Sequence, residues 1–391
     1  MTRKPVVART NKYLPLQILF RLYIEIKKGC LSKTTCCNCR SLNISSSFEV
    51  MQQLKEKKKK SQGEEDENQF PNNHSPLIQC GELILPWLTP PELACIAFTC
   101  KALSQTSKTI TLQRSFDASR SFENRPIPFH NALNYPPYAY FLYTPSLLLA
   151  SESPQRQPWG FSRSDGSRIP PRKNLLKWEC GCDCEGCEQE GEDGRGFLDL
   201  EEMELGIMSE CGPSCGCGLD CGNRLTQRGV SVKLKIVREE KKGWSLYADQ
   251  LIPQGQFVCE YSGELLTTEE ARRRQQIYDD LTSHGQFYSA LLVVREHLPS
   301  GKACLRVNID ATRTGNVARF INHSCDGGNL STILVRSSGA LLPRLCFFAS
   351  KDIREGEELT FSYGETRVKS KGLQCFCGSS CCFGILPSEH T

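Results

Sequence analysis

Long apolar runs are missing from this chain of 391 residues. The most apolar stretch, residues 141–150, is short and contains Pro145, whereas a membrane-spanning helix needs about 20 apolar residues. We therefore expect no membrane span. An apolar segment followed by a small-residue cleavage site, which would direct secretion, is missing as well. Without an oxidising compartment, the cysteines are expected to be reduced thiols or metal ligands rather than disulfides.

A strong overall charge is also missing, since the formal net charge is only +4. The positive charge gathers in residues 1–60, which hold fourteen Lys or Arg against three Asp or Glu, so the remainder is mildly acidic. The mildly acidic remainder of the chain is not expected to bind phosphates, although the basic tail could contact nucleic acid. Hydrophobic residues at 39% and charged residues at 24% are ordinary for folded domains.

The N-terminal residues 1–76 are expected to form a disordered extension. Residues 1–50 contain few acids, as organelle transit peptides do. Alternatively, Met51 is the true start, and the lysine run 57–60 then acts as a nuclear address or as part of a solvated linker. Residues 61–76 are polar and lack apolar periodicity. The sequence leaves these interpretations open.

Residues 77–143 are expected to form a small helical region. Pro90 and Pro91 precede Glu92 as a helix start, and Ala94, Ile96, Ala97 and Leu103 recur at helical spacing on one expected buried side. The stretch PPELACIAFTCKALSQTS resembles the second half of an F-box. Residues 144–177 are rich in Pro, Ser and Arg, which is typical of an interdomain linker.

Cysteine is unusually abundant, with 23 residues. Eight of them fall in two dense runs separated by short Gly-containing steps, a spacing that lets a loop wrap several thiolates around Zn²⁺. The first run is Cys180, Cys182, Cys184 and Cys187, and the second is Cys211, Cys215, Cys217 and Cys221. With no other obvious core, residues 178–225 are expected to fold only on metal.

The second run, C-x3-C-x-C-x3-C followed by Asn223 and Arg224, resembles a pre-SET domain. In that family nine cysteines hold three zinc ions. This chain offers eight in the two runs, so the resemblance implies two or three Zn²⁺ in this segment.

Residues 226–366 resemble a SET domain at three motifs. The string KKGWSLYADQ supplies Gly243 and Trp244, with Ser245 at the place of a second glycine, and EYSGE supplies Tyr261. The strings NVARFINHSC and ELTFSYG complete the match. The resemblance implies binding of the methyl donor S-adenosylmethionine (AdoMet) by Gly243, Trp244, Arg319, Asn322 and His323. It implies catalytic positions at Tyr261, Phe361 and Tyr363.

Residues 367–391 have the spacing of a post-SET zinc site. Cys375, Cys377 and Cys382 supply three thiols, and the resemblance implies that Cys325 of the N-H-S-C motif supplies the fourth ligand for one Zn²⁺. The expected fold is mostly β with short helices: a SET-domain fold with its pseudoknot, flanked by cysteine-rich zinc-binding segments, and a small helical N-terminal region.

Lysine methylation suits these residue types. The amine must be neutral to attack, although the reference pKa of lysine is about 10.4, and an aromatic channel disfavours the ammonium form. Tyr261, Phe361 and Tyr363 can line such a channel. Phenylalanine at 361 leaves space that a tyrosine would fill, so di- and trimethylation are permitted. An extended peptide substrate would add along a sheet edge.

The three segments together resemble the suppressor-of-variegation group of histone methyltransferases, most closely its plant SUVR branch. The resemblance implies a nuclear, chromatin-bound enzyme that methylates histone H3 on nucleosomes, at lysine-9, as a repressive mark. Two other classes remain open from the sequence: a ubiquitin-ligase adaptor working through the F-box-like helices, and a zinc-dependent chromatin-binding protein without activity.

Overall fold

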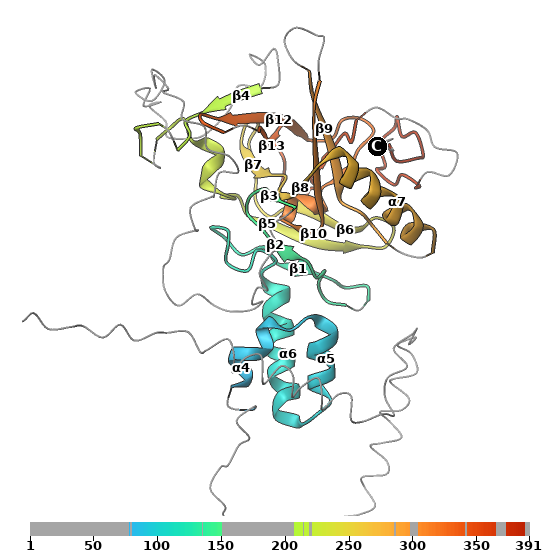
Figure 1. The fold of residues 1–391 in the computed structure, drawn as a ribbon. Helices are drawn as coiled ribbons and strands as arrows, with labels where there is room; N and C mark the ends of the chain where they lie inside the picture. Colours follow the sequence, from blue (N-terminus) through green and yellow to red (C-terminus); the bar gives the residue numbers. More distant parts are fainter. Residues whose placement is uncertain are drawn as a thin grey trace, which may run out of the picture. The chain divides into compact units, whose positions relative to one another are not determined.

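A computed structural model of the chain describes residues 78, 80–134, 136–150, 207–213, 215–218, 221–284, 287–297, 304–340, 342–364 and 373–387. Contacts divide it into two compact units (Figure 1). One holds the described residues up to Leu85 together with 91–106, and the other holds 86–90 and the described residues from 107 onward. Among the described residues, no helix combines the length and apolar character that crossing a membrane requires.

The N-terminal elements are helical, as expected. They are α4 (Gly81–Ile84), the 3-10 turn η1 (Leu85–Trp87), α5 (Pro90–Ala97) and α6 (Lys101–Phe116), which continues into the second unit. Pro90 begins α5, where the missing N–H of proline is no loss. Ile96 is buried as the spacing predicts. Ala94, expected on the buried side, is exposed, and Leu93 fills the inner position beside it.

The second unit is built of short sheets. A three-stranded sheet has the order β1 (Phe129–His130), β5 (Leu234–Glu239), β6 (Gly243–Ala248). A five-stranded sheet has the order β2 (Leu142–Tyr143), β10 (Cys304–Gly315), β8 (Gly263–Leu266), β3 (Leu148–Leu149), with β9 (Leu291–His297) also paired to β10. Helix α7 (Thr268–His284) follows β8 in the chain and packs against β8 and β10 (Figure 1).

Two further sheets complete this unit. The four-stranded one has the order β4 (Ile207–Glu210), β12 (Leu330–Ser337), β13 (Arg344–Ala349), β7 (Phe257–Glu260). The two-stranded one pairs β11 (Asn322–His323) with β14 (Thr360–Phe361). Two 3-10 turns lie between strands, η2 (Leu225–Arg228) and η3 (Val317–Phe320). The mostly β fold with few short helices agrees with the expected fold class.

Residues 107–150 are part of this β unit, which differs from the expected division into a helical region 77–143 and a linker 144–177. Strand β1 pairs with β5, β2 with β10, and β3 with β8, all in parallel. Phe129, Phe141 and Tyr143 are buried in the same hydrophobic core as the later strands. Each of these strands is only two residues long, so none produces the apolar alternation that predicts a strand.

Candidate active site

The parallel pairing of β11 with β14 brings two distant motifs together. Asn322 lies opposite Thr360 and His323 opposite Phe361 in the register. The N–H of Ser324 continues the pairing by donating to the carbonyl of Phe361 at 3.0 Å. This crossing places the string INHSC directly beside the strand that leads to Tyr363.

The three expected channel residues lie together, and a fourth ring joins them. The ring of Phe361 lies 4.9 Å from that of Tyr363 and 4.8 Å from that of Phe347, between ring centroids. Phe347 in turn lies 6.3 Å from Tyr261. Sequence reasoning missed Phe347, which occupies one position of an apolar run in β13 and carries no motif of its own.

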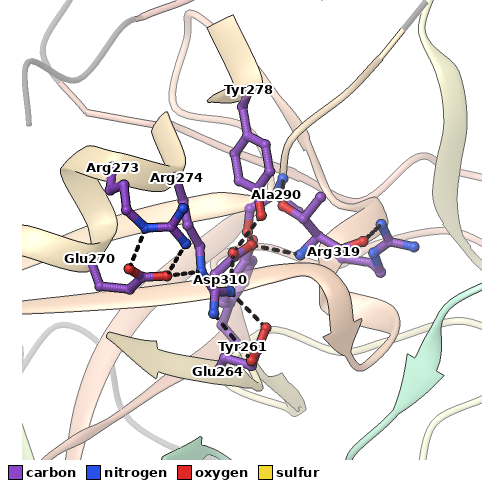
Figure 2. Close-up of polar contacts among 10 residues, drawn as sticks. Tyr261, Glu264, Glu270, Arg273, Arg274, Tyr278, Ala290, Asp310 and Arg319 are labelled. Carbon is purple, nitrogen blue, oxygen red and sulfur yellow. Dashed lines mark hydrogen bonds and ion pairs between the residues drawn. The ribbon is translucent and has the colours of Figure 1, made fainter. Parts of the chain in front are cut away.

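Both tyrosine hydroxyls have their protons committed to backbone carbonyls. The hydroxyl of Tyr261 donates to the carbonyl of Ala290 at 2.7 Å (Figure 2). The hydroxyl of Tyr363 donates to the carbonyl of Ile321 at 2.8 Å. Burial is the main cause that raises the pKa of each phenol above its ordinary value. Both phenols are therefore neutral at physiological pH, with oxygen lone pairs available to accept hydrogen bonds.

Strand β6 begins at a position that requires glycine. Gly243 has φ of +85°, a backbone conformation that side chains rarely adopt. The adjacent Trp244 packs edge-on against Phe129 at 5.3 Å, and the guanidinium of Arg238 lies over its ring at 5.5 Å. The start of β6 is thus fixed by the positive φ of Gly243 and by the contacts of the indole with Phe129 and Arg238.

The side chain of Asn322 joins β6 to the chain just before β14. Its Nδ2 donates to Oγ of Ser245 at 2.7 Å and to Oε1 of Glu358 at 3.0 Å. Glu358 also pairs with Lys242. Serine at the place of the second glycine is therefore a hydrogen-bond acceptor for Asn322. Sequence reasoning missed Glu358, since an acidic string such as EGEELT is typical of solvent-exposed carboxylates.

Arg319 packs against two aromatic rings. Its guanidinium carbon lies 4.8 Å from the ring centre of Phe141 and 5.0 Å from that of Phe320. Nη2 donates to the carbonyl of Thr312 at 2.8 Å, while the buried Nε makes no hydrogen bond within the described part of the chain. Burial lowers the pKa of Arg319 to about 10, so it stays charged at neutral pH. A buried cation with a spare N–H suits an anionic ligand group.

His323 connects the aromatic channel to a cluster of thiols. Its Nδ1 accepts from the N–H of Tyr363 at 3.1 Å, so the ring proton belongs on Nε2, which lies 3.2 Å from Sγ of Cys325. Burial lowers the pKa of His323 and thereby favours the neutral ring. His323 thus couples the position of Tyr363 to that of Cys325.

Four thiols at the C-terminal end form a group suited to one metal ion. The sulfur atoms all lie within 4.8 Å of one another, and they belong to Cys325, Cys375, Cys377 and Cys382. Although burial opposes it, hydrogen bonds from Ser379 help to lower the pKa of Cys377 to about 6. The adjacent Cys381 is exposed and stands outside the group. Four sulfur donors at this separation are a donor set typical of zinc.

A second group consists of Cys211, Cys217 and Cys221, again with sulfur atoms within 4.8 Å of one another. Cys215 stands apart from this group, and its sulfur accepts from the N–H of Gly212 at 3.2 Å. The remaining expected ligands, Cys180, Cys182, Cys184 and Cys187, lie outside the described residues. Three thiolates leave at least one position of a tetrahedral zinc site for another ligand.

Comparisons with known proteins place this site in context. A family model for the SET domain matches residues 243–364. The chain is 61% identical over 333 residues to the histone-lysine N-methyltransferase SUVR3 of Arabidopsis thaliana, covering 80% of this chain and 92% of that protein.

Two solved structures are similar. The methyltransferase domain of human SETMAR has a TM-score of 0.51 at 28% identity, covering 70% of this chain and 97% of that one. Arabidopsis thaliana SUVH6 in complex with SAM has a TM-score of 0.50 at 26% identity, covering 70% of this chain and 55% of that one.

Proposed function

Since the chain belongs to the SET-domain histone-lysine N-methyltransferases, we propose that it transfers methyl groups from AdoMet to lysine-9 of histone H3. The observation that carries the catalytic part of this proposal is the state of the two tyrosines. Both hydroxyl protons are bonded to backbone carbonyls, so both oxygens remain as acceptors among packed aromatic side chains. This is the arrangement needed to receive a lysine amine and orient its lone pair.

In this proposal Tyr261, Phe361 and Tyr363 line the lysine channel. The apolar rings disfavour the ammonium form of the substrate lysine and so lower its pKa. The N–H groups of the neutral amine would donate to the hydroxyl oxygens of Tyr363 and Tyr261, which fixes the direction of the nitrogen lone pair. AdoMet supplies the electrophilic methyl group when bound. Alignment in an in-line displacement is worth up to roughly 7–11 kcal/mol in well-oriented systems.

The methyl-donor site is proposed to consist of Gly243, Trp244, Arg319, Asn322 and His323. The amino-acid part of AdoMet carries a carboxylate, and the buried guanidinium of Arg319 with its spare Nε–H fits such a group. Asn322 and Ser245 join the segments that would surround the donor. His323 supports the site through its bonds to Tyr363 and Cys325.

Zinc is the proposed metal of both cysteine segments. One ion would be held by Cys325, Cys375, Cys377 and Cys382, whose sulfur atoms already converge. Two or three ions would be held by the pre-SET segment, with Cys211, Cys217 and Cys221 forming one group of donors. The ion at the C-terminal group would be structural, since four thiolate ligands leave no open position for chemistry.

Histone H3 at lysine-9 and a location in nuclear chromatin are the finer parts of the proposal. The supporting facts are the 61% identity to a histone-lysine methyltransferase and the resemblance to the suppressor-of-variegation group. A role of the basic residues 1–60 in contacting nucleic acid is proposed on their charge alone.

Incubation of the purified chain with radiolabelled AdoMet and H3-tail peptides tests this function. We expect label on the native tail peptide and none on a matched peptide in which lysine-9 is replaced by arginine. Label on both peptides would refute the lysine-9 assignment. No label on any histone, despite measurable AdoMet binding, would refute the histone substrate.

A further inference from the structure

A buried carboxylate connects helix α7 to strand β10 (Figure 2). Asp310 is fully buried, and its Oδ2 accepts from Nη1 of Arg274 and from the hydroxyl of Tyr278, each at 2.7 Å. Arg274 also donates to Glu264 at 2.7 Å and to Glu270 at 2.9 Å. Burial alone would raise the pKa of Asp310, but these hydrogen bonds and those of Thr312 hold it below its ordinary value. The carboxylate is therefore a fixed acceptor.

Thr312 transmits this fixed position to the neighbouring segment. Its backbone N–H donates to Oδ1 of Asp310 at 2.9 Å. The hydroxyl oxygen Oγ1 of Thr312 accepts from the N–H of Ala290 at 2.9 Å. The buried carboxylate thus holds the backbone of Thr312, and the side-chain oxygen of Thr312 holds the N–H of Ala290.

Ala290 is the residue whose carbonyl receives the hydroxyl of Tyr261, at 2.7 Å. The same carbonyl accepts from the N–H of Ala311 at 3.0 Å. Ala290 is therefore held at its N–H by Thr312 and at its carbonyl by Ala311. Its placement decides where the hydroxyl of Tyr261 points.

We infer that Thr312 is a positioning residue for methyl transfer, acting through Ala290 on the hydroxyl of Tyr261. The inference rests on the proposed function, in which Tyr261 orients the lysine amine. A hydroxyl that turns away from the amine lowers the turnover rate, since small misplacements of reacting groups cost large factors in rate. The chain of contacts runs from α7 through Asp310 and Thr312 to the channel.

The side chain and the backbone of Thr312 serve different parts of the site. Its carbonyl accepts from Nη2 of Arg319 at 2.8 Å, on the side proposed to bind the methyl donor. A substitution of the side chain keeps this carbonyl. Variants of Thr312 that remove the hydroxyl should therefore change turnover and leave AdoMet affinity nearly unchanged.

Two variants separate this role from packing. Thr312→Val keeps the shape but removes the hydroxyl, and Thr312→Ser keeps the hydroxyl but removes the methyl group. We expect kcat on the H3-tail peptide to fall roughly 10-fold in Thr312→Val and to stay within about twofold in Thr312→Ser. Thr332→Val, on the exposed side of β12, is the matched control and should not change kcat. Equal kcat in the valine and serine variants would overturn the inference.

Amide hydrogen exchange supplies a readout that needs no turnover. In the chain without AdoMet, the amide of Ala290 should exchange faster in Thr312→Val than in Thr312→Ser, because only the valine variant lacks its acceptor. Unchanged exchange at this amide would overturn the inference. If the unmodified chain methylates no histone peptide, the proposed function fails. The exchange comparison would still show whether Thr312 holds Ala290.

A double-mutant cycle with Tyr261→Phe tests the route of the effect. If Thr312 acts through the hydroxyl of Tyr261, removing that hydroxyl first should leave Thr312→Val with less than about a twofold further loss of kcat. A loss as large as in the unmodified background would mean that Thr312 acts by another route, and would contradict the inference.

Discussion

The strands around the channel differ from the C-terminal cysteine segment in what can stabilise their folded structure. Strands β5, β6, β7 and β13 contribute a large set of buried apolar side chains to one core. In the described residues 373–387, only Cys375 is buried, and Phe383 is 64% exposed. Burial of apolar area can stabilise the strands, whereas the cysteine segment needs cross-linking through its four thiols.

This difference matters because one residue connects the two regions. His323 accepts from the N–H of Tyr363 on one side and lies against the sulfur of Cys325 on the other. Loss of the metal should therefore disturb the channel without unfolding the strands that surround it. In the proposed function, the C-terminal segment would act on catalysis through the position of Tyr363 rather than through a reacting group.

Removal of the metal is expected to have the largest effect. We expect chelation to release at least three zinc ions per chain and to reduce methylation to background. Backbone amides of residues 211–228 and 373–387 should then exchange rapidly, while those of β12 and β13 stay protected. Metal analysis and hydrogen exchange measure these effects. Release of one ion or none would contradict the assignment of zinc to both segments.

A matched pair of cysteine variants tests the same prediction at single residues. Cys377→Ser removes a proposed ligand and should lower the zinc content by one ion per chain. Cys381→Ser changes an exposed thiol four residues further on, outside the group, and should leave the zinc content unchanged. Equal zinc content in both variants would show that the convergence of the four thiols does not bind metal.

The next largest effect concerns the donor side of the strand region. Asn322→Ala removes the amide that joins Ser245 and Glu358. We expect AdoMet affinity to fall about 10-fold, which corresponds to about 1.4 kcal/mol and to one hydrogen bond involving a charged group. Calorimetric titration measures it, with Asn134→Ala on an exposed loop as the control. An unchanged affinity would remove Asn322 from the donor site.

A smaller change in rate but a clear change in product is expected at Phe361. Phe361→Tyr adds a hydroxyl to a side chain that is only 4% exposed and lies next to Tyr363. The added group should occupy the space needed by a methylated amine and shift the product toward monomethyl-lysine. Mass spectrometry of the peptide product measures the ratio, with Phe383→Tyr as the exposed control. An unchanged ratio would contradict the proposed channel.

No effect at all is expected from removal of residues 1–70, which carry none of the matched motifs. Methylation of a peptide in vitro should be unchanged, and a large loss would show that this segment contributes to the site. Removal of residues 1–150 should instead abolish cooperative unfolding, since it deletes β1, β2 and β3 together with Phe129 and Phe141. The two deletions together distinguish the basic tail, which the fold does not need, from strands β1, β2 and β3, which it does need.

Much of the fold and site could be predicted from local strings. The motifs around Gly243, Tyr261, Asn322 and Tyr363 predicted the fold class, and the structure brings their residues together. Cysteine spacing predicted three members of the group at the C-terminal end, and the resemblance implied the fourth, Cys325. These features are visible because each one needs particular residue types at a fixed spacing.

Features that depend on distant pairing could not be predicted. Phe347, Glu358 and Thr312 act through neighbours far along the chain, and nothing in their local sequence distinguishes them from ordinary strand or loop residues. The two-residue strands in 129–149 are too short for a periodic pattern. Their place is set by the sheets they join, which only the three-dimensional structure shows.

The most direct test of the account is the rate of methyl transfer by Tyr363→Phe, measured together with AdoMet affinity on the same preparation. The substitution keeps the ring and its packing, so the fold should survive. Loss of one preorganised hydrogen-bonding group should lower the rate roughly 100-fold or more, with AdoMet affinity nearly unchanged. Full turnover in this variant would make Tyr363 a core residue and would contradict the proposed active site.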